Sequence, residues 1–150
     1  MNNSSLNELG PLIKIANTLI EKELNNRIAR AITDYNLTGP QITMMVYLYE
    51  AHGKTITQKE LADKFVLSHP TIRSVVRRLE KASLLSAERM PADRRQIKLS
   101  LTTAGNSFIA THLAVIYGIM NEVNRQIVQG LSPADLERIT KILQQIIKNF

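Results

Sequence analysis

Apolar residues recur three and four positions apart in six stretches of the chain, which is the spacing of residues on one helix face. The first stretch covers residues 12–35 and is expected to begin near Pro11, with Ser5 and Glu8 as an alternative start in a capping box. The pattern therefore predicts a mainly helical protein. The other stretches each begin at a Ser or Thr that can cap a helix, and they cover residues 38–53, 57–65, 68–81, 102–130 and 132–147.

Between the fourth and fifth of these helices the period of the pattern changes to two. In residues 96–101 the odd positions are apolar and the even positions are polar, which is typical of a half-buried strand. Residues 84–89 are expected to pair with this strand, and residues 90–95 to form the hairpin loop between them. The expected fold class is mainly α with a small β-hairpin.

The composition excludes several classes of protein. The chain of 150 residues has the length of one domain, and it contains no cysteine, which removes disulfides, thiolate metal sites and cysteine nucleophiles. Its most apolar stretch, residues 108–120, contains polar residues and is shorter than the ~20 apolar residues that a membrane span needs. No membrane partner is expected, and the N-terminus carries no export signal, so a cytoplasmic protein is expected.

The positive charge of the chain is concentrated in its middle third. The whole chain has a net charge of +6, and the segment from Lys54 to Lys98 alone holds eleven basic and five acidic residues, which is also +6. A polyanion such as nucleic acid is the natural partner of such a segment. On charge alone, a solvated basic face that serves solubility explains the segment equally well.

Residues 57–95 have the order of a winged helix-turn-helix: a short helix, a turn at residues 66–68, a second helix and a hairpin with a basic tip. A helix about 10–12 Å across fits the major groove of DNA, provided that one face anchors it and the other carries donors. The anchoring positions in the second helix are Ile72, Val75, Val76 and Leu79. The opposite face carries hydroxyl and guanidinium groups, at Thr71, Arg73, Ser74, Arg77 and Arg78.

The hairpin tip carries Asp93, Arg94 and Arg95. A narrow minor groove attracts guanidinium groups, so one of the two arginines is expected to enter it, and the sequence leaves open which. Asp93 either caps the turn of its own hairpin or holds Arg95 by a charge-assisted bond. These two roles are compatible.

The run from Asp93 to Thr102 resembles the wing signature of MarR-type bacterial transcriptional regulators, in which Asp-x-Arg is followed by a strand and by Leu-Thr at the start of a long helix. The segments 57–62 and 68–72 are similar to the two helices of the helix-turn-helix in that family. His69 and Pro70 depart from the small polar residues of many relatives, so the base preference does not carry over. The resemblance spans nearly the whole chain.

This resemblance implies a homodimeric regulator of double-stranded DNA, usually a repressor that a small anionic or phenolic ligand relieves. Residues 37–102 are then the winged helix-turn-helix, and residues 1–36 and 103–150 are the flanking N- and C-terminal dimerisation helices. Two-fold symmetry predicts an inverted-repeat operator. The predicted DNA-contacting residues are Ser68, His69, Thr71, Arg73, Ser74, Arg77, Asp93, Arg94 and Arg95.

A cavity for a small-molecule effector is a further prediction. Large apolar and aromatic residues at helical spacing could line it, although such residues are more often core or dimer seam. A metal-responsive regulator is an alternative, but the three histidines, His52, His69 and His112, are scattered over three elements. The candidate effector-binding residues are Met44, Tyr47, Phe108, Tyr117 and Met120, with Met45 beside them.

Two other classes of function compete with DNA binding. An enzyme would need an activated nucleophile, a glycine-rich phosphate loop or a close histidine–carboxylate pair, and the sequence suggests none of these, nor a cofactor. A winged helix that docks proteins is the stronger alternative, because fold does not fix function. A docking surface should expose aromatic residues or leucines on the outer face of residues 68–78, and the sequence places none there.

Overall fold

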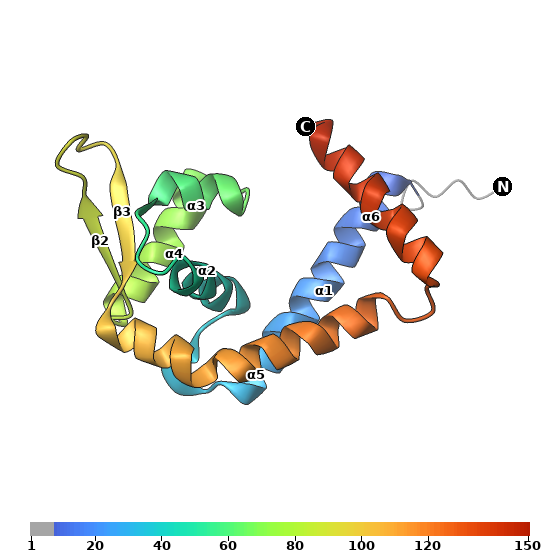
Figure 1. Ribbon diagram of the computed structural model, residues 1–150, viewed down its shortest axis with the longest axis horizontal. Helices are drawn as coiled ribbons and strands as arrows, with labels where there is room; N and C mark the ends of the chain where they lie inside the picture. The colour runs from blue at the N-terminus through green and yellow to red at the C-terminus, as the bar shows by residue number, and fades with distance from the viewer. Residues whose placement is uncertain (1–7) are drawn as a thin grey trace.

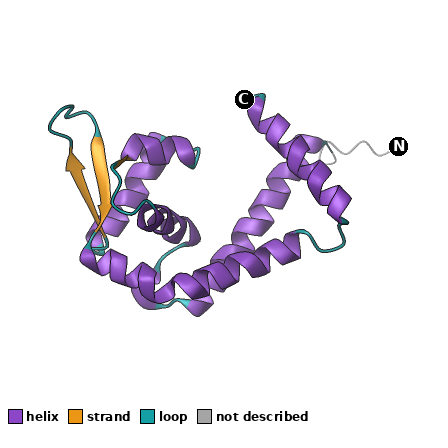
Figure 2. Ribbon diagram, viewed as in Figure 1, coloured by secondary structure: helices purple, strands orange, loops and turns teal. Residues whose placement is uncertain are grey.

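The computed structural model describes residues 8–150, and the predicted fold class, mainly helical with a small antiparallel sheet, is confirmed (Figures 1 and 2). The elements in chain order are α1 (Leu9–Ala31), the 3-10 helix η2 (Asp34–Asn36), α2 (Gly39–Glu50), β1 (Ile56–Thr57), α3 (Gln58–Lys64), α4 (His69–Lys81), β2 (Leu85–Arg89), β3 (Ile97–Leu101), α5 (Thr103–Ile127) and α6 (Pro133–Lys148).

The starts of the helices follow the predicted caps. The Thr38 hydroxyl accepts a bond from the Gln41 backbone N–H, and the Gln41 side chain accepts one from the Thr38 N–H at 2.9 Å. At α3 the Thr57 hydroxyl accepts a bond from the Glu60 N–H at 3.1 Å, which is one of the two bonds of a capping box. These bonds satisfy N–H groups that have no partner within their own helix.

The first helix differs from its prediction at both ends. Helix α1 begins at Leu9, with Glu8 at its cap and no side-chain capping bond, and Ser5 lies outside the described residues. It ends at Ala31 rather than at residue 35, because the backbone of Ile32 is extended and its side chain is buried. A turn with left-handed residues at 35 and 36 then leads into α2.

The sheet has three strands in the order β1-β3-β2, all antiparallel. Ile56 of β1 lies opposite Leu99 of β3, and both side chains are buried. The sequence pattern predicts only the β2–β3 hairpin. Strand β1 has only two residues, which is too short for an alternating pattern to appear.

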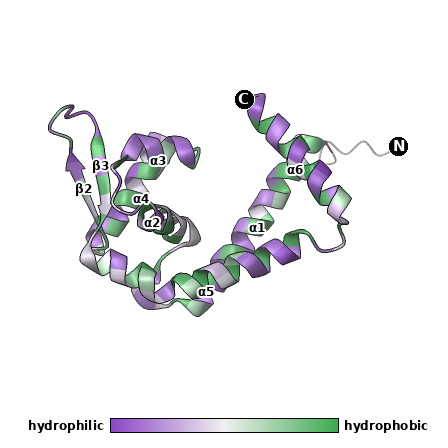
Figure 3. Ribbon diagram, viewed as in Figure 1, coloured by the Kyte–Doolittle hydropathy of each residue, from purple (hydrophilic) through white to green (hydrophobic). Residues whose placement is uncertain are grey.

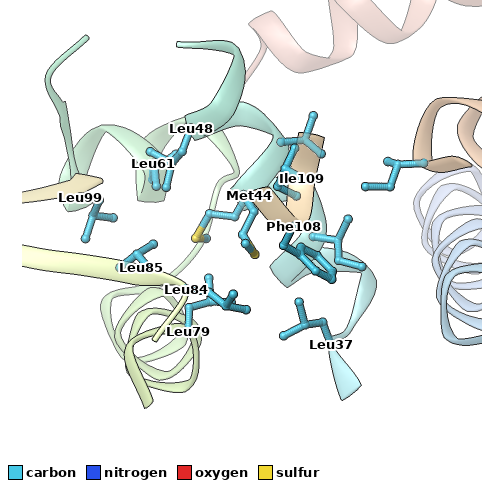
Figure 4. Packing of buried hydrophobic residues seen from close by; sticks show 14 of the residues in the cluster. Leu37, Met44, Leu48, Leu61, Leu79, Leu84, Leu85, Leu99, Phe108 and Ile109 are labelled. Carbon is cyan, nitrogen blue, oxygen red and sulfur yellow. The ribbon is translucent and has the colours of Figure 1, made fainter. Parts of the chain in front are cut away.

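The hydrophobic core lies between α2, α4, the sheet and the first turns of α5 (Figure 4). Met44 and Leu48 of α2, Leu79 of α4 and Leu99 of β3 are among its buried side chains. Helix α5 passes so close to the chain before β2 that a Cβ atom on Gly105 would lie 2.1 Å from the Leu84 carbonyl oxygen. Glycine at this position therefore lets α5 pack against the sheet end of the core.

Helices α1, α5 and α6 extend away from this core and give the chain an open V shape (Figure 1). Helix α1 packs along α5, where Arg27 donates bonds to Glu23, Glu122 and Gln126 at 2.7–3.2 Å. Neither the outer half of α1 nor α6 has a buried residue. Their apolar residues, visible as green bands in Figure 3, face solvent in the single chain.

Candidate nucleic-acid interface

Helix α4 has one buried face and one polar face. Its start is fixed by Ser68, whose hydroxyl accepts a bond from the Thr71 N–H at 3.3 Å, and by Pro70 in the first turn. Ile72 and Leu79 have no exposed surface, and Val76 is 3% exposed. The apolar positions thus lock the rotation of the helix, so that its remaining positions point outward.

The outward positions of α4 form a shallow hollow of about 410 Å³. Within residues 8–150, none of its arginines forms an ion pair with a carboxylate, so their positive charges are available to an external anion. Of the predicted DNA-contacting residues, four lie together here, and Pro70 and Arg78 join them although the prediction omits both. The hollow is lined by His69, Pro70, Arg73, Ser74, Arg77 and Arg78.

Ser68 and Thr71 lie at the start of the same helix and are both exposed. Their hydroxyl oxygens are 2.8 Å apart and share a hydrogen bond. Ser68 also caps the helix, so its hydroxyl already serves two bonds within the chain. Thr71 has the freer hydroxyl of the two and is the better placed to bond an external acceptor.

The wing is the loop of residues 90–95 between β2 and β3, and it projects beyond the body of the molecule (Figure 1). Backbone bonds close it, from the Met90 N–H to the Gln96 carbonyl at 3.0 Å and from the Gln96 N–H to the Asp93 carbonyl at 2.9 Å. The Arg89 guanidinium donates to the Arg94 carbonyl at 2.7 Å. Sequence reasoning missed this bond, because no pattern links a strand residue to a loop carbonyl.

Asp93 has both of the roles that the sequence left open. Its carboxylate accepts a bond from the Arg95 backbone N–H at 3.1 Å, which shapes the turn. It also accepts two bonds from the Arg95 guanidinium, from Nε at 3.1 Å and from Nη2 at 3.3 Å. These side-chain bonds, followed by the backbone bond, hold the pKa of Asp93 below its ordinary value.

The two wing arginines differ in their freedom. The Arg95 side chain is 92% exposed, but its guanidinium group is held by Asp93, so its direction is restricted. Arg94 is exposed, and only its backbone carbonyl is bonded. Which of the two enters a DNA groove stays a prediction.

The predicted effector residues do not line one common cleft in the described part of the chain. Met44 and Phe108 are buried in the core, with Met45 beside them. Tyr47 packs edge-to-face on Phe65, with ring centres 5.8 Å apart. The described clefts bring no two of these residues together, and an effector cavity built from them stays a prediction.

The other two effector candidates lie on the outer part of α5. Tyr117 donates a hydrogen bond to Glu50, which raises the pKa of the phenol. Met120 is 40% exposed, although the apolar spacing predicts it on the buried side of α5. Ile119 is buried instead, because Ile116, Ile119 and Val123 form the inward stripe of α5.

One histidine forms a close carboxylate pair, which corrects the expectation that the chain has none. His112 Nε2 lies 3.2 Å from Asp34 Oδ2, and the two residues are 78 positions apart in the sequence. That separation explains why no local motif predicts the pair. Within residues 8–150, no group of three or more His, Asp or Glu side chains is placed to hold a metal ion.

None of the helices within residues 8–150 is long and apolar enough to cross a membrane.

The comparisons with known proteins agree with this geometry. Residues 26–112, more than half of the chain, match the family described as transcriptional regulator SarA/Rot. The chain is 31% identical over 93 residues to YdcH of Bacillus subtilis, described as an HTH-type transcriptional regulator. This match covers 60% of the chain and 63% of YdcH, so the chain spans less than two thirds of that relative.

Solved structures of MarR-type regulators share the fold over almost the whole chain. The transcription regulator MarR of Oenococcus oeni is 28% identical and superposes with a TM-score of 0.69 over 94% of this chain and 99% of its own. MepR of S. aureus, solved as a complex with DNA, is 19% identical and has a TM-score of 0.78, covering 95% and 98% of the two chains. The predicted resemblance to MarR-type regulators is thereby confirmed. The protein has their winged helix-turn-helix fold and belongs to the SarA/Rot family of transcriptional regulators.

Proposed function

We propose that this regulator is a homodimeric repressor that binds an inverted-repeat operator in double-stranded DNA. The observation that carries the proposal is the outward face of α4, where a histidine and three arginines line one hollow, and none of these arginines is paired with a carboxylate of residues 8–150. In this proposal residues 37–102 bind DNA, and residues 1–36 and 103–150 form the dimerisation region.

Helix α4 is proposed to lie in the major groove. Arg73 and Arg77 are one helical turn apart on the outward face, so they reach successive positions along the groove. An arginine bonds a guanine edge through two donors, and the hydroxyls of Thr71 and Ser74 can bond bases or phosphates. The buried positions of α4 hold it rigidly enough for such contacts to depend on the DNA sequence.

The wing is proposed to contact the adjacent minor groove. Asp93 orients Arg95 through two guanidinium bonds, and the Arg89 bond to the Arg94 carbonyl stiffens the loop beside it. A pre-oriented guanidinium loses less side-chain entropy when it enters a groove. MepR, which has a similar fold, was solved as a complex with DNA, and this supports DNA binding by the present chain.

A second copy of the chain is proposed to cover the exposed apolar residues of the long helices. Such a large apolar surface is rare on a monomer and normally marks an interface. The stripe on α6 is the longest part of it, and α1 and α5 continue it. Its exposed members include Leu12, Ile15, Leu19, Val115, Ile127, Leu136, Ile139, Ile142, Leu143 and Ile147.

The test starts from genomic fragments that the purified protein selects, followed by footprinting of the bound fragments. The proposal predicts protected half-sites in inverted orientation, about 34 Å or roughly 10 base pairs apart. A single asymmetric half-site bound with full affinity would contradict the dimeric arrangement. Failure to select any duplex, with capture of another protein through the α4 face, would favour a docking module.

The last part of the proposal is that a small-molecule effector relieves repression, and it rests on the resemblance to MarR-type regulators. A small anionic or phenolic ligand is proposed to change the distance between the two α4 helices by a rigid-body movement. Salicylate-like acids are the first compounds to test. If a panel of phenolic acids changes neither the melting temperature nor the DNA affinity, this part of the proposal fails.

A further inference from the structure

A cleft of about 510 Å³ lies between the end of α2 and strand β3. Its walls are the last turn of α2, the turn at residues 52–54, β3 and the first turn of α5. Strand β3 lies between β1 and β2, and α4 packs against β2. Of the described residues, those of α4 and of the wing take no part in lining the cleft, so it is separate from the proposed DNA surface.

Among the described residues, the lining of this cleft includes two lysines and a histidine and no aspartate or glutamate. His52 and Lys54 come from the turn after α2, and Lys98 comes from β3. Within residues 8–150, neither lysine has a carboxylate within ion-pair distance, including Glu88, which lies opposite Lys98 on β2. Two ammonium groups at one cleft repel each other, and an anion bound between them is attracted to both.

The remaining lining supplies hydrogen-bond donors and an apolar wall. Tyr49 and Ser100, which carry hydroxyl groups, line the cleft, and both residues are half-buried. Leu101, which is half-buried, also lines the cleft, and the side chains of Leu48 and Leu99 beside it are buried. The volume is within the ~300–1,000 Å³ of small-molecule sites and is much larger than an inorganic ion needs. An organic group can therefore bind beside the charged one.

We infer that this cleft is a binding site for a small phosphomonoester. The two lysines match the double negative charge of a phosphate ester, and the hydroxyls can donate to its oxygens. The organic part of the molecule occupies the rest of the cleft. Because the site includes no residue of α4 or of the wing, this assignment does not depend on the proposed contacts to DNA.

The test is calorimetric titration of the full chain with glycerol 3-phosphate and, separately, with inorganic phosphate, at constant ionic strength. Glycerol 3-phosphate should bind with a dissociation constant of about 1 mM or tighter. Lys54→Gln and Lys98→Gln should each weaken binding by about tenfold. Lys22→Gln is the matched control, because Lys22 is an exposed lysine on α1, and it should bind like the wild type.

Several results would overturn the assignment. Equal weakening by Lys22→Gln would show that only the net charge of the protein matters. Equal affinity for inorganic phosphate would remove the organic ester from the assignment. If the wild type binds neither probe while Lys54→Gln and Lys98→Gln lower DNA affinity, the two lysines are contacts to the DNA backbone. Thermal unfolding of each variant checks that it remains folded.

Discussion

The winged region buries most of its apolar residues within one chain, whereas α6 and the outer half of α1 leave theirs exposed. In the winged region, Leu61, Ile72 and Leu79 have no exposed surface. On α6, Ile142 is 49% exposed and Ile147 is 73% exposed, although the helix has the same apolar spacing. The same sequence pattern therefore has two outcomes. One set of stripes closes a core, and the other stays exposed in the single chain.

The largest effect is expected from breaking the closed core. Leu79→Ala removes a fully buried side chain between α4 and the sheet, and it should lower the free energy of unfolding by about 2–5 kcal/mol. Urea denaturation measures the loss. The neighbouring exposed change Arg78→Ala should alter the same free energy by less than about 0.5 kcal/mol. Equal effects of the two changes would mean that α4 is not anchored by its apolar face.

The next effect concerns the open surface of α6. Ile142→Asp introduces a charge into the proposed interface. Burying a carboxylate that has no opposite charge beside it should weaken self-association by about a hundredfold, or ~3 kcal/mol. Sedimentation should show a dimer for the wild type and a monomer for the variant. Gln144→Asp, which adds the same charge at an exposed polar position of α6, should remain dimeric. A wild type that sediments as a monomer would contradict the proposed interface.

A smaller effect is expected on the outward face of α4. Arg73→Ala removes one unpaired guanidinium and should weaken operator binding by about 1–3 kcal/mol if it bonds a guanine through two donors. The preference for one base of the operator should relax at the same time. Binding measured on operators with each base changed in turn tests this. Uniform weakening on all of them would instead assign Arg73 to a phosphate.

Substitutions in the wing should weaken DNA binding without changing the preference for particular bases. Arg94→Ala and Arg95→Ala should each weaken binding to many sequences together, and each lost phosphate contact should lower the salt slope by about one unit. Asp93→Ala separates the effect of the wing's net charge from the effect of orienting Arg95, because the change makes the protein more positive and removes the bonds to the Arg95 guanidinium. If Asp93 orients Arg95, DNA affinity should fall despite the added charge. Unchanged or higher affinity would show that the orientation is unimportant.

The smallest effect is that of pH on the wing. The bonds from Arg95 to the Asp93 carboxylate hold the pKa of Asp93 in the folded protein below the unfolded value of about 3.9. The contribution of the Asp93–Arg95 pair to stability is therefore complete above the unfolded pKa, and it is lost as the pH falls through the lower pKa of the folded protein. The NMR signal of Arg95 Nε–H should shift over that acid range and remain constant at neutral pH. A signal insensitive to acid would contradict the bond.

The parts of the fold that a local pattern encodes could be predicted from the sequence. Helix α4, its cap at Ser68 and its two faces follow from residues within four positions of one another. The hairpin and its loop follow from the alternation in residues 96–101 and the turn residues before it. The Asp93–Arg95 contact joins residues two positions apart, so it too is visible in the sequence.

The parts that depend on distant contacts could not be predicted in this way. Strand β1 exists because Ile56 pairs with Leu99 across the core, and two residues carry no period of their own. The His112–Asp34 pair joins residues 78 positions apart. Met120 and Ile119 are adjacent apolar residues, and only the packing of α5 decides that Ile119 is the buried one. The basic cleft likewise gathers side chains from separate elements.

The most direct test of the central claim, that the outward face of α4 binds DNA, compares two double variants on one selected operator. Arg73→Ala/Arg77→Ala removes two charges from this face, and Lys22→Ala/Arg30→Ala removes two exposed charges from α1. At equal salt, the first should weaken binding by more than about a hundredfold, and the second by less than about threefold. Equal affinities of the two variants would contradict the assignment of α4 as the DNA-binding helix.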